Sequence, residues 1–173
     1  MSQQPEYIIE NECLRVRIAA CGAEMTSITQ KGAGDRVGLE RLWCGDPAVW
    51  RRHAPILFPL IGRLREGFYL LGDRRIDAPT HGFCRDRVFE AVQLSPGAVR
   101  FSTSNDEQTR GVYPFAFSFS VEYALEGNAI VKTHRVVNRG EGAMPFEIGG
   151  HGLCGPPAAR RAHGGLFRAV RGA

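Results

Sequence analysis

Apolar and polar residues alternate along much of this chain with a period of two, which is typical of half-buried strands. In residues 14–18, apolar side chains alternate with arginines. The longest such stretch places large apolar residues on one face and small or polar residues on the other; the apolar set is Phe115, Phe117, Phe119, Val121, Tyr123 and Leu125. This pattern predicts a long strand with one buried face.

Turn residues separate the alternating stretches, and Ser95-Pro96-Gly97 and Glu126-Gly127-Asn128 each predict a hairpin turn. Segment 103–111 is expected to be a loop, because no stretch shows a helical period longer than about three turns. The fold class is therefore all-β, a sandwich or barrel in one domain. The further expected elements are strands at 23–29, 88–94, 98–102 and 129–138, a short hairpin at 69–76 and one helical turn at 46–53.

Composition sets the last residues apart from the others. Gly, Ala, Arg and Pro make up 16 of the 22 residues of 152–173, which hold four arginines and no acid. Residues 1–151 are therefore balanced at 18 basic and 18 acidic residues, although the whole chain has a net charge of +4. A basic excess confined to one tail argues against nucleic-acid binding. We divide the chain into a domain at 1–151 and an aberrant tail at 152–173, either a frameshift product or an ordinary disordered end.

Three further observations concern location. No apolar run approaches the roughly 20 residues needed to span a bilayer, so no membrane partner is expected. The first residues lack the basic and apolar regions of a signal peptide. The five cysteines are scattered and do not form a disulfide framework, which fits a reducing compartment. The expected location is the cytoplasm.

The first cluster of chemical interest is the run PILFPLIGRL at residues 55–64. Its two prolines argue against a regular central strand. Arg63 interrupts an otherwise apolar run, and burying its charge requires an anionic or hydroxyl partner. The residue types fit either an ion pair at the edge of the core or a ligand contact.

Two more clusters each contain a histidine. In residues 79–85, His81 precedes a glycine that allows a ligand to approach the backbone, and Phe83 offers a ring face to a sugar. In residues 145–151, an apolar strand ends in two glycines and His151. A histidine at the rim of a sheet suits general acid–base chemistry, because its unperturbed pKa of about 6.5 lies close to neutral.

These clusters, in this order, resemble the aldose 1-epimerase (galactose mutarotase-like) family, in the branch of lactose-operon-associated epimerases. The resemblance covers about residues 7 to 151 and corresponds to the N-terminal part of the family. It is carried by PILFPLIGRL at 55–64, HGFCR at 81–85, NDEQT at 105–109, YPFAF at 113–117, Asn138 and PFEIGGH at 145–151.

The resemblance implies a β-supersandwich, here truncated on its C-terminal side, and interconversion of the α and β anomers of an aldose by acid–base ring opening. No cofactor or metal is implied. His151 matches the catalytic acid, His81 the second histidine, and Arg63 the arginine that binds sugar hydroxyls. The expected partner is a small sugar, an aldohexose or its phosphate; Phe83 and Arg85 are further substrate-binding candidates, Arg85 with Arg51 and Arg52 for a phosphate. The oligomeric state is not predicted.

The chain departs from the family pattern after His151. The family's general base is a glutamate far downstream, whereas residues 152–173 contain no acid, and Gly152-Leu153-Cys154 replaces the usual proline and aromatic. Glu147 shares strand parity with His151, but four residues of strand separate them by roughly 13 Å, too far for one sugar carbon. A weak or inactive enzyme, or a non-catalytic sugar-binding module, is therefore the alternative.

Two other expectations follow from the residues. The pattern H-G-x-C occurs at His81–Cys84 and at His151–Cys154, and two histidines with two cysteines can bind zinc, although the spacing is unusual. Cys84 is otherwise expected to fill the core. If the sandwich is incomplete, the row Phe115, Phe117 and Phe119 is expected to be its most exposed apolar surface.

Overall fold

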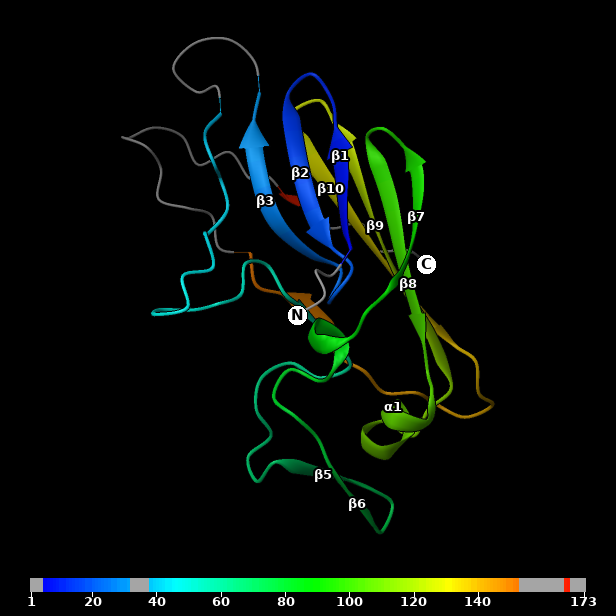
Figure 1. Ribbon diagram of the computed structural model, residues 1–173. Coiled ribbons are helices and arrows are strands. Elements are labelled where there is room, and N and C mark those ends of the chain that lie inside the picture. Colours follow the sequence, from blue (N-terminus) through cyan, green and yellow to red (C-terminus); the bar gives the residue numbers. More distant parts are fainter. Residues whose placement is uncertain (1–4, 32–37, 153–166, 169–173) are drawn as a thin grey trace.

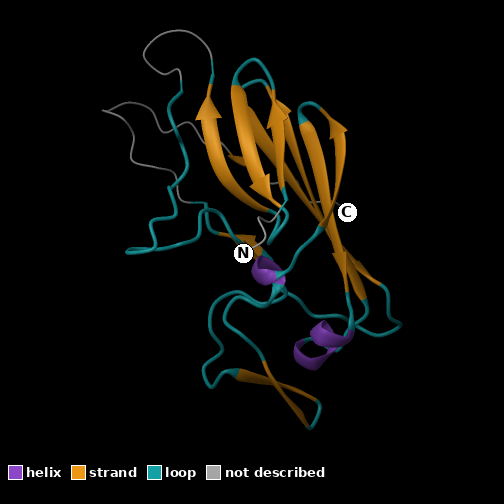
Figure 2. Cartoon of the chain, in the orientation of Figure 1, coloured by secondary structure: helices purple, strands orange, loops and turns teal. Residues whose placement is uncertain are grey.

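The computed structural model describes residues 5–31, 38–152 and 167–168. Of the described residues, 49% are in strands and 6% in helices, so the all-β prediction is confirmed (Figure 2). Two sheets, of three and five strands, face each other to form a sandwich (Figure 1). In the part of the chain described, no helix is long and apolar enough to cross a membrane.

The first sheet has three strands in the order β1-β2-β3. They are β1 (Glu6–Glu10), β2 (Leu14–Ala19) and β3 (Glu24–Gln30). In β2 the apolar residues Leu14, Val16 and Ile18 are buried and the arginines between them are exposed, as the alternation predicts.

The second sheet has five strands in the order β12-β10-β9-β8-β7. They are β7 (Glu90–Ser95), β8 (Ala98–Ser104), β9 (Phe117–Glu126), β10 (Ala129–Asn138) and β12 (Phe167–Arg168). The first four run antiparallel through the two predicted turns, and β12 pairs in parallel with β10 at residues 130–131.

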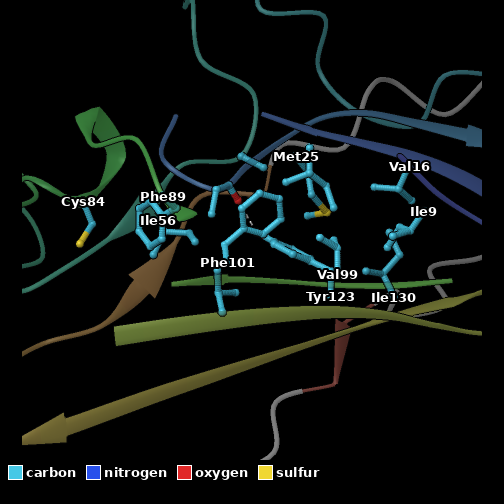
Figure 3. Packing of buried hydrophobic residues seen from close by; sticks show 14 of the residues in the cluster. Ile9, Val16, Met25, Ile56, Cys84, Phe89, Val99, Phe101, Tyr123 and Ile130 are labelled. Atoms are coloured by element: carbon cyan, nitrogen blue, oxygen red, sulfur yellow. Dashed lines mark hydrogen bonds between the residues drawn. The ribbon is translucent and has the colours of Figure 1, made fainter. Parts of the chain in front are cut away.

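The core lies between the inner faces of the two sheets (Figure 3). Phe117 and Phe119 are 0% and 1% exposed, so the expectation that their row forms the most exposed apolar surface is wrong. The first sheet and the segment around Phe58 already cover this row, and the Phe58 and Phe119 rings stack with centroids 4.8 Å apart. Burying large aromatic rings of this kind is a main source of stability in such a core.

Shorter elements extend below the sandwich in Figure 1. β4 (Ile56–Leu57) pairs with β11 (Gly149–Gly150), and β5 (Phe68–Leu71) pairs with β6 (Arg74–Asp77) as the predicted hairpin. The short 3₁₀ turn η1 covers Cys84–Asp86. The predicted helical turn begins at Asp46, whose carbonyl oxygen accepts hydrogen bonds from the amides of Val49 and Trp50.

The segment expected to be a loop at 103–111 instead contains the helix α1 (Glu107–Val112). A capping box starts this helix, because the Asp106 carboxylate accepts a hydrogen bond from the Thr109 amide, and the Thr109 hydroxyl accepts one from the Asp106 amide. Of the tail, 153–166 and 169–173 lie outside the described residues, so its expected disorder stays a prediction; residues 167–168 form β12.

Candidate functional site

The loop that carries His81 is fixed to the buried Phe58. The Phe58 carbonyl oxygen accepts a hydrogen bond from the Phe83 amide at 3.1 Å. Gly82, between the two loop residues, has a φ of +69°. A Cβ atom at Gly82 would lie 2.2 Å from the Phe58 carbonyl oxygen, so only glycine permits this approach. The core thereby sets the position of the loop.

His81 makes two hydrogen bonds with Gly62. The His81 amide donates to the Gly62 carbonyl oxygen at 2.8 Å, and the Gly62 amide donates to His81 Nδ1 at 2.9 Å. Because Nδ1 accepts a hydrogen bond, the neutral ring carries its proton on Nε2. His81 has a φ of +67°, which is rare for a residue with a side chain and marks a position held by its surroundings.

The pKa of His81 is lowered from its usual value. Burial is the largest cause, and the charges of Arg85 and His151 act in the same direction. The ring is therefore neutral at neutral pH and presents Nε2–H as a hydrogen-bond donor. A neutral donor of this kind suits a hydroxyl or ring oxygen of a sugar.

His151 is placed by the pair of strands β4 and β11. Gly149 and Gly150 pair with Leu57 and Ile56, and the His151 amide then donates to the Pro55 carbonyl oxygen at 3.1 Å. The exposed His151 ring meets the His81 ring edge to face, with centroids 5.4 Å apart. The structure thus brings together the two histidines that stand 70 residues apart in the chain.

Arg63 directly follows the residue that binds His81. Its side chain is exposed, and no ion pair or hydrogen bond to another described residue occupies its guanidinium group. Glu147 lies on the opposite loop, where its carboxylate accepts a hydrogen bond from the Ile61 amide at 2.8 Å. This bond gives Glu147 a structural task and joins the loops that carry Arg63 and His151.

Arg85 and Phe83 occupy more buried positions than a simple substrate contact requires. Arg85 Nε lies 3.5 Å from Asp86 Oδ2. Arg85 Nε is buried and has no hydrogen-bond partner in the described part of the chain. The Phe83 ring packs against the core, 6.1 Å from the Phe117 ring and 6.5 Å from the Phe58 ring. These contacts account for Phe83 without a sugar, and its role as a sugar contact stays a prediction.

The structure gives no support to the zinc alternative. Cys84 is 0% exposed and belongs to the core, as expected, and burial raises the pKa of its thiol to about 12. Cys154 lies outside the described residues. Within residues 5–31, 38–152 and 167–168, no group of three or more metal-binding side chains comes together.

The sequence analysis missed Trp50, whose half-buried ring lies 6.2 Å from the His151 ring. An aromatic residue just before a proline-rich run was the available signal. It also missed Glu24, a 7% exposed carboxylate that accepts hydrogen bonds from the amides of His53 and Ala54 at 2.5 and 2.9 Å. Glu24 thereby fixes the chain that enters β4, the strand that pairs beside His151.

Comparison with known proteins decides the family. The family model for aldose 1-epimerase matches residues 5–153. The chain belongs to the aldose 1-epimerase family. Protein LacX, chromosomal, from Lactococcus lactis is 34% identical over 151 residues, which cover 83% of this chain and 48% of LacX. This result confirms the family and the LacX-like branch that the motifs predict.

Solved structures show the same fold for this aldose epimerase family chain. A galactose mutarotase related enzyme from Lactobacillus acidophilus matches with a TM-score of 0.84 and 34% identity, over 92% of this chain and 52% of that one. A galactose mutarotase-like protein from Lactobacillus casei matches with a TM-score of 0.79 and 34% identity, over 84% and 48%. The chain therefore spans about half the length of the relatives that it matches.

Proposed function

We propose that this chain binds an aldose beside His81 and His151 and supplies the acid side of anomer interconversion. The supporting observation is the edge-to-face pair of histidine rings with centroids 5.4 Å apart, one of which has its tautomer set by Gly62. Family membership supports an epimerase-like isomerase. The geometry supports an oxygen-rich ligand, because neutral His81 donates through Nε2 while Arg63 offers several unoccupied donors.

In the proposed reaction, a base removes the proton of the C1 hydroxyl while the bond between C1 and the ring oxygen breaks. The electron pair of that bond goes to the ring oxygen, which takes a proton from His151. His81 donates a hydrogen bond to the sugar oxygens at the reacting carbon. Rotation of the resulting aldehyde, followed by the reverse steps on its other face, gives the second anomer. Histidine suits the acid role because it changes charge near neutral pH.

The proposed reaction needs a general base, and the described residues near the two histidines offer no free carboxylate for this role. The family resemblance assigns it to a downstream glutamate, and this chain spans 48% of the LacX length. Glu147 is bound to the Ile61 amide, and Glu24 to the amides of His53 and Ala54. Losing one positioned acid–base group removes about 10²–10⁴-fold in rate, so we expect at most trace turnover.

The charges around the site favour an unphosphorylated aldose. Of the arginines considered for a phosphate, Arg52 lies 2.5 Å from Asp86 and 3.8 Å from Glu24. Arg85 lies 3.5 Å from the same Asp86. Two of these three arginines are thus already paired with acids, and only Arg51 among them has no ion pair within the described residues. Arg63, which is not one of the three, is assigned to neutral sugar hydroxyls.

Polarimetry on freshly dissolved α-galactose and α-glucose tests the catalytic part, and NMR titration with the same sugars tests binding. We expect shifts of the His81 and His151 ring signals on sugar addition, and rotation that changes little faster than in buffer. Binding that His151→Gln leaves intact, with no turnover in either protein, would support the non-catalytic sugar-binding module instead. No shift of either histidine at saturating sugar would overturn the proposal, and Arg74→Ala, on the distant hairpin, is the matched control.

A further inference from the structure

An ion cluster around Arg52 joins segments of the chain that lie far apart in the sequence. The Arg52 guanidinium donates through Nη1 to the Arg85 carbonyl oxygen at 3.1 Å and through Nη2 to Asp86 Oδ1 at 2.5 Å. The same Nη1 lies 3.8 Å from Glu24 Oε2. Arg52 therefore connects the turn η1, which contains both of its hydrogen-bond acceptors, with the strand β3.

One end of this cluster leads to His151. Glu24 is 7% exposed, and its Oε1 accepts hydrogen bonds from the amides of His53 and Ala54 at 2.5 and 2.9 Å. The next residue, Pro55, supplies the carbonyl oxygen that accepts a hydrogen bond from the His151 amide at 3.1 Å. The position of Glu24 is thus passed to His151 through backbone hydrogen bonds.

The other end of the cluster leads to the loop that carries His81. η1 directly follows this loop, and the Asp86 amide donates to the Phe83 carbonyl oxygen at 3.0 Å. A Cβ atom at Gly22 would lie 2.8 Å from the Arg85 carbonyl oxygen, so the turn between β2 and β3 packs closely on the same backbone. The carbonyl that binds Arg52 is therefore held in place from a second side.

The residue type at position 52 matters for this geometry. Its side chain is 25% exposed, and its guanidinium binds a carbonyl oxygen and a carboxylate at once while it faces a second carboxylate. The planar guanidinium fork presents several donors in fixed directions, whereas a lysine ammonium is a point charge on a flexible stem. A lysine at this position would keep the charge but not the simultaneous contacts.

The cluster also affects the charge near His81. Arg85 Nε lies 3.5 Å from Asp86 Oδ2, so Arg52 and Arg85 share one carboxylate. Burial is the first cause of the lowered pKa of His81, and the Arg85 charge is the second. Without Arg52, Asp86 would pair with Arg85 alone and neutralise more of its charge. The loss of Arg52 would therefore raise the pKa of His81 toward its usual value.

We propose that Arg52 is a positioning residue that fixes the His81 loop relative to His151 by holding η1 against Glu24. Arg52 acts through the backbone on both sides and has no assigned contact with a sugar. The functional meaning of this role rests on the proposed sugar site, whereas the geometry that Arg52 maintains can be measured without a sugar.

NMR of the whole chain without sugar tests the positioning role. The readouts are the nuclear Overhauser contact between the rings of His81 and His151 and the pKa of His81. We expect Arg52→Met to weaken the contact and to raise this pKa, and Arg52→Lys to weaken the contact although it keeps the charge. Asp86→Asn, which changes an exposed side chain, is expected to weaken the contact less.

Two controls separate a displaced loop from a general loss of structure. Arg75→Met removes an arginine that donates two hydrogen bonds to Asp77 on the distant hairpin, and we expect it to change neither readout. The contact between the Phe58 and Phe119 rings reports on the core and is expected to persist in each variant. An unchanged histidine contact in both Arg52 variants would overturn the proposal. Loss of the core contact together with the histidine contact would also overturn it, because Arg52 would then serve only general stability.

Titration with galactose distinguishes this inference from the proposed function. We expect Arg52→Met to weaken binding on the order of tenfold, because the groups of a site must be held close to their productive geometry. If the unaltered chain binds galactose and Arg52→Met binds it equally well, the positioning role falls while the sugar site stands. If the histidine contact depends on Arg52 but the unaltered chain binds no sugar, the positioning role stands and the proposed function falls.

Discussion

The two ring nitrogens of His81 have different tasks. Nδ1 accepts a hydrogen bond from the Gly62 amide, which leaves Nε2–H free to donate. Arg63 follows Gly62 directly, so the backbone that orients His81 also fixes the start of the arginine side chain. At the scale of single residues, the candidate site is therefore a neutral histidine and a cation held on one short segment.

Replacing Arg63 or His81 with alanine should weaken sugar binding without unfolding the chain. Each removes hydrogen bonds to the sugar worth about 1–3 kcal/mol, which corresponds to a roughly 5- to 150-fold loss of affinity. NMR titration with galactose measures the affinity, and the unfolding midpoint in urea checks the fold. Arg74→Ala is the control for a lost exposed arginine. Unchanged affinity in both variants would remove these residues from the site.

At the scale of elements, the short strands β4 and β11 matter more than their length suggests. They link the first sheet to the site, because Glu24 of β3 holds the amides of His53 and Ala54 just before β4, while β11 leads into His151. Just after β4, the Phe58 carbonyl oxygen accepts a hydrogen bond from the Phe83 amide, and the close approach of Gly82 to the same carbonyl fixes the loop that carries His81. The geometry of the site therefore depends on backbone contacts that few side chains allow.

Gly82→Ala should destabilise the chain and disturb the histidine pair. The new Cβ meets the Phe58 carbonyl oxygen, and alanine is strained at a φ of +69°, so the cost is about 1–3 kcal/mol or more. Gly72→Ala is a matched control, because its φ is +60° and nothing lies within 4 Å of the added carbon. Urea unfolding of both variants separates the backbone strain from the close contact. Equal losses would show that the approach to Phe58 costs nothing.

At the scale of the whole molecule, the sandwich is well filled at β8 and β9 and incomplete at β10. Lys132 and His134 lie at this boundary, where partial burial lowers the pKa of each. A histidine that stays neutral in the folded protein but gains a proton when unfolded makes stability depend on pH. The incomplete side of the sandwich is therefore expected to limit the stability of the chain in acid.

The free energy of unfolding should fall as the pH drops from 6.5 toward 3. Over this range His134 is protonated in the unfolded state but stays neutral in the folded state, because its folded pKa is lowered to about 3. The resulting loss of stability is therefore absent above pH 6.5 and grows as the pH falls below it. By pH 4.5 the loss reaches about 3 kcal/mol. Urea unfolding at pH 7 and 4.5 measures the loss, which is expected to be smaller in His134→Phe, a variant that keeps the stacking on Phe119. Identical losses in the two proteins would exclude His134 as the cause.

Much of the sheet structure was predictable because strand alternation is a local property. The hairpins at β5–β6, β7–β8 and β9–β10 follow from alternating side chains and turn residues that lie next to each other in the chain. The helix α1 was missed because its six residues are too few to show a helical period. The signal that marks its start is the capping box between Asp106 and Thr109, which is a hydrogen-bonding pattern and not a hydrophobic one. Local pattern and local hydrogen bonding gave different signals there.

The candidate site shows the limit of the sequence more sharply. The order of the motifs pointed to Arg63, His81 and His151, because residue types and their order along the chain can be compared with a family pattern without a structure. Which side chains meet was decided by tertiary contacts: the Phe58 carbonyl positions His81, Ile61 engages Glu147, and the Phe83 ring faces the core. The sequence by itself thus determined the strands, the turns and the identity of the chemical groups. Only the folded structure decided their neighbours, because burial, hydrogen-bond partners and the resulting pKa values depend on residues far apart in the chain.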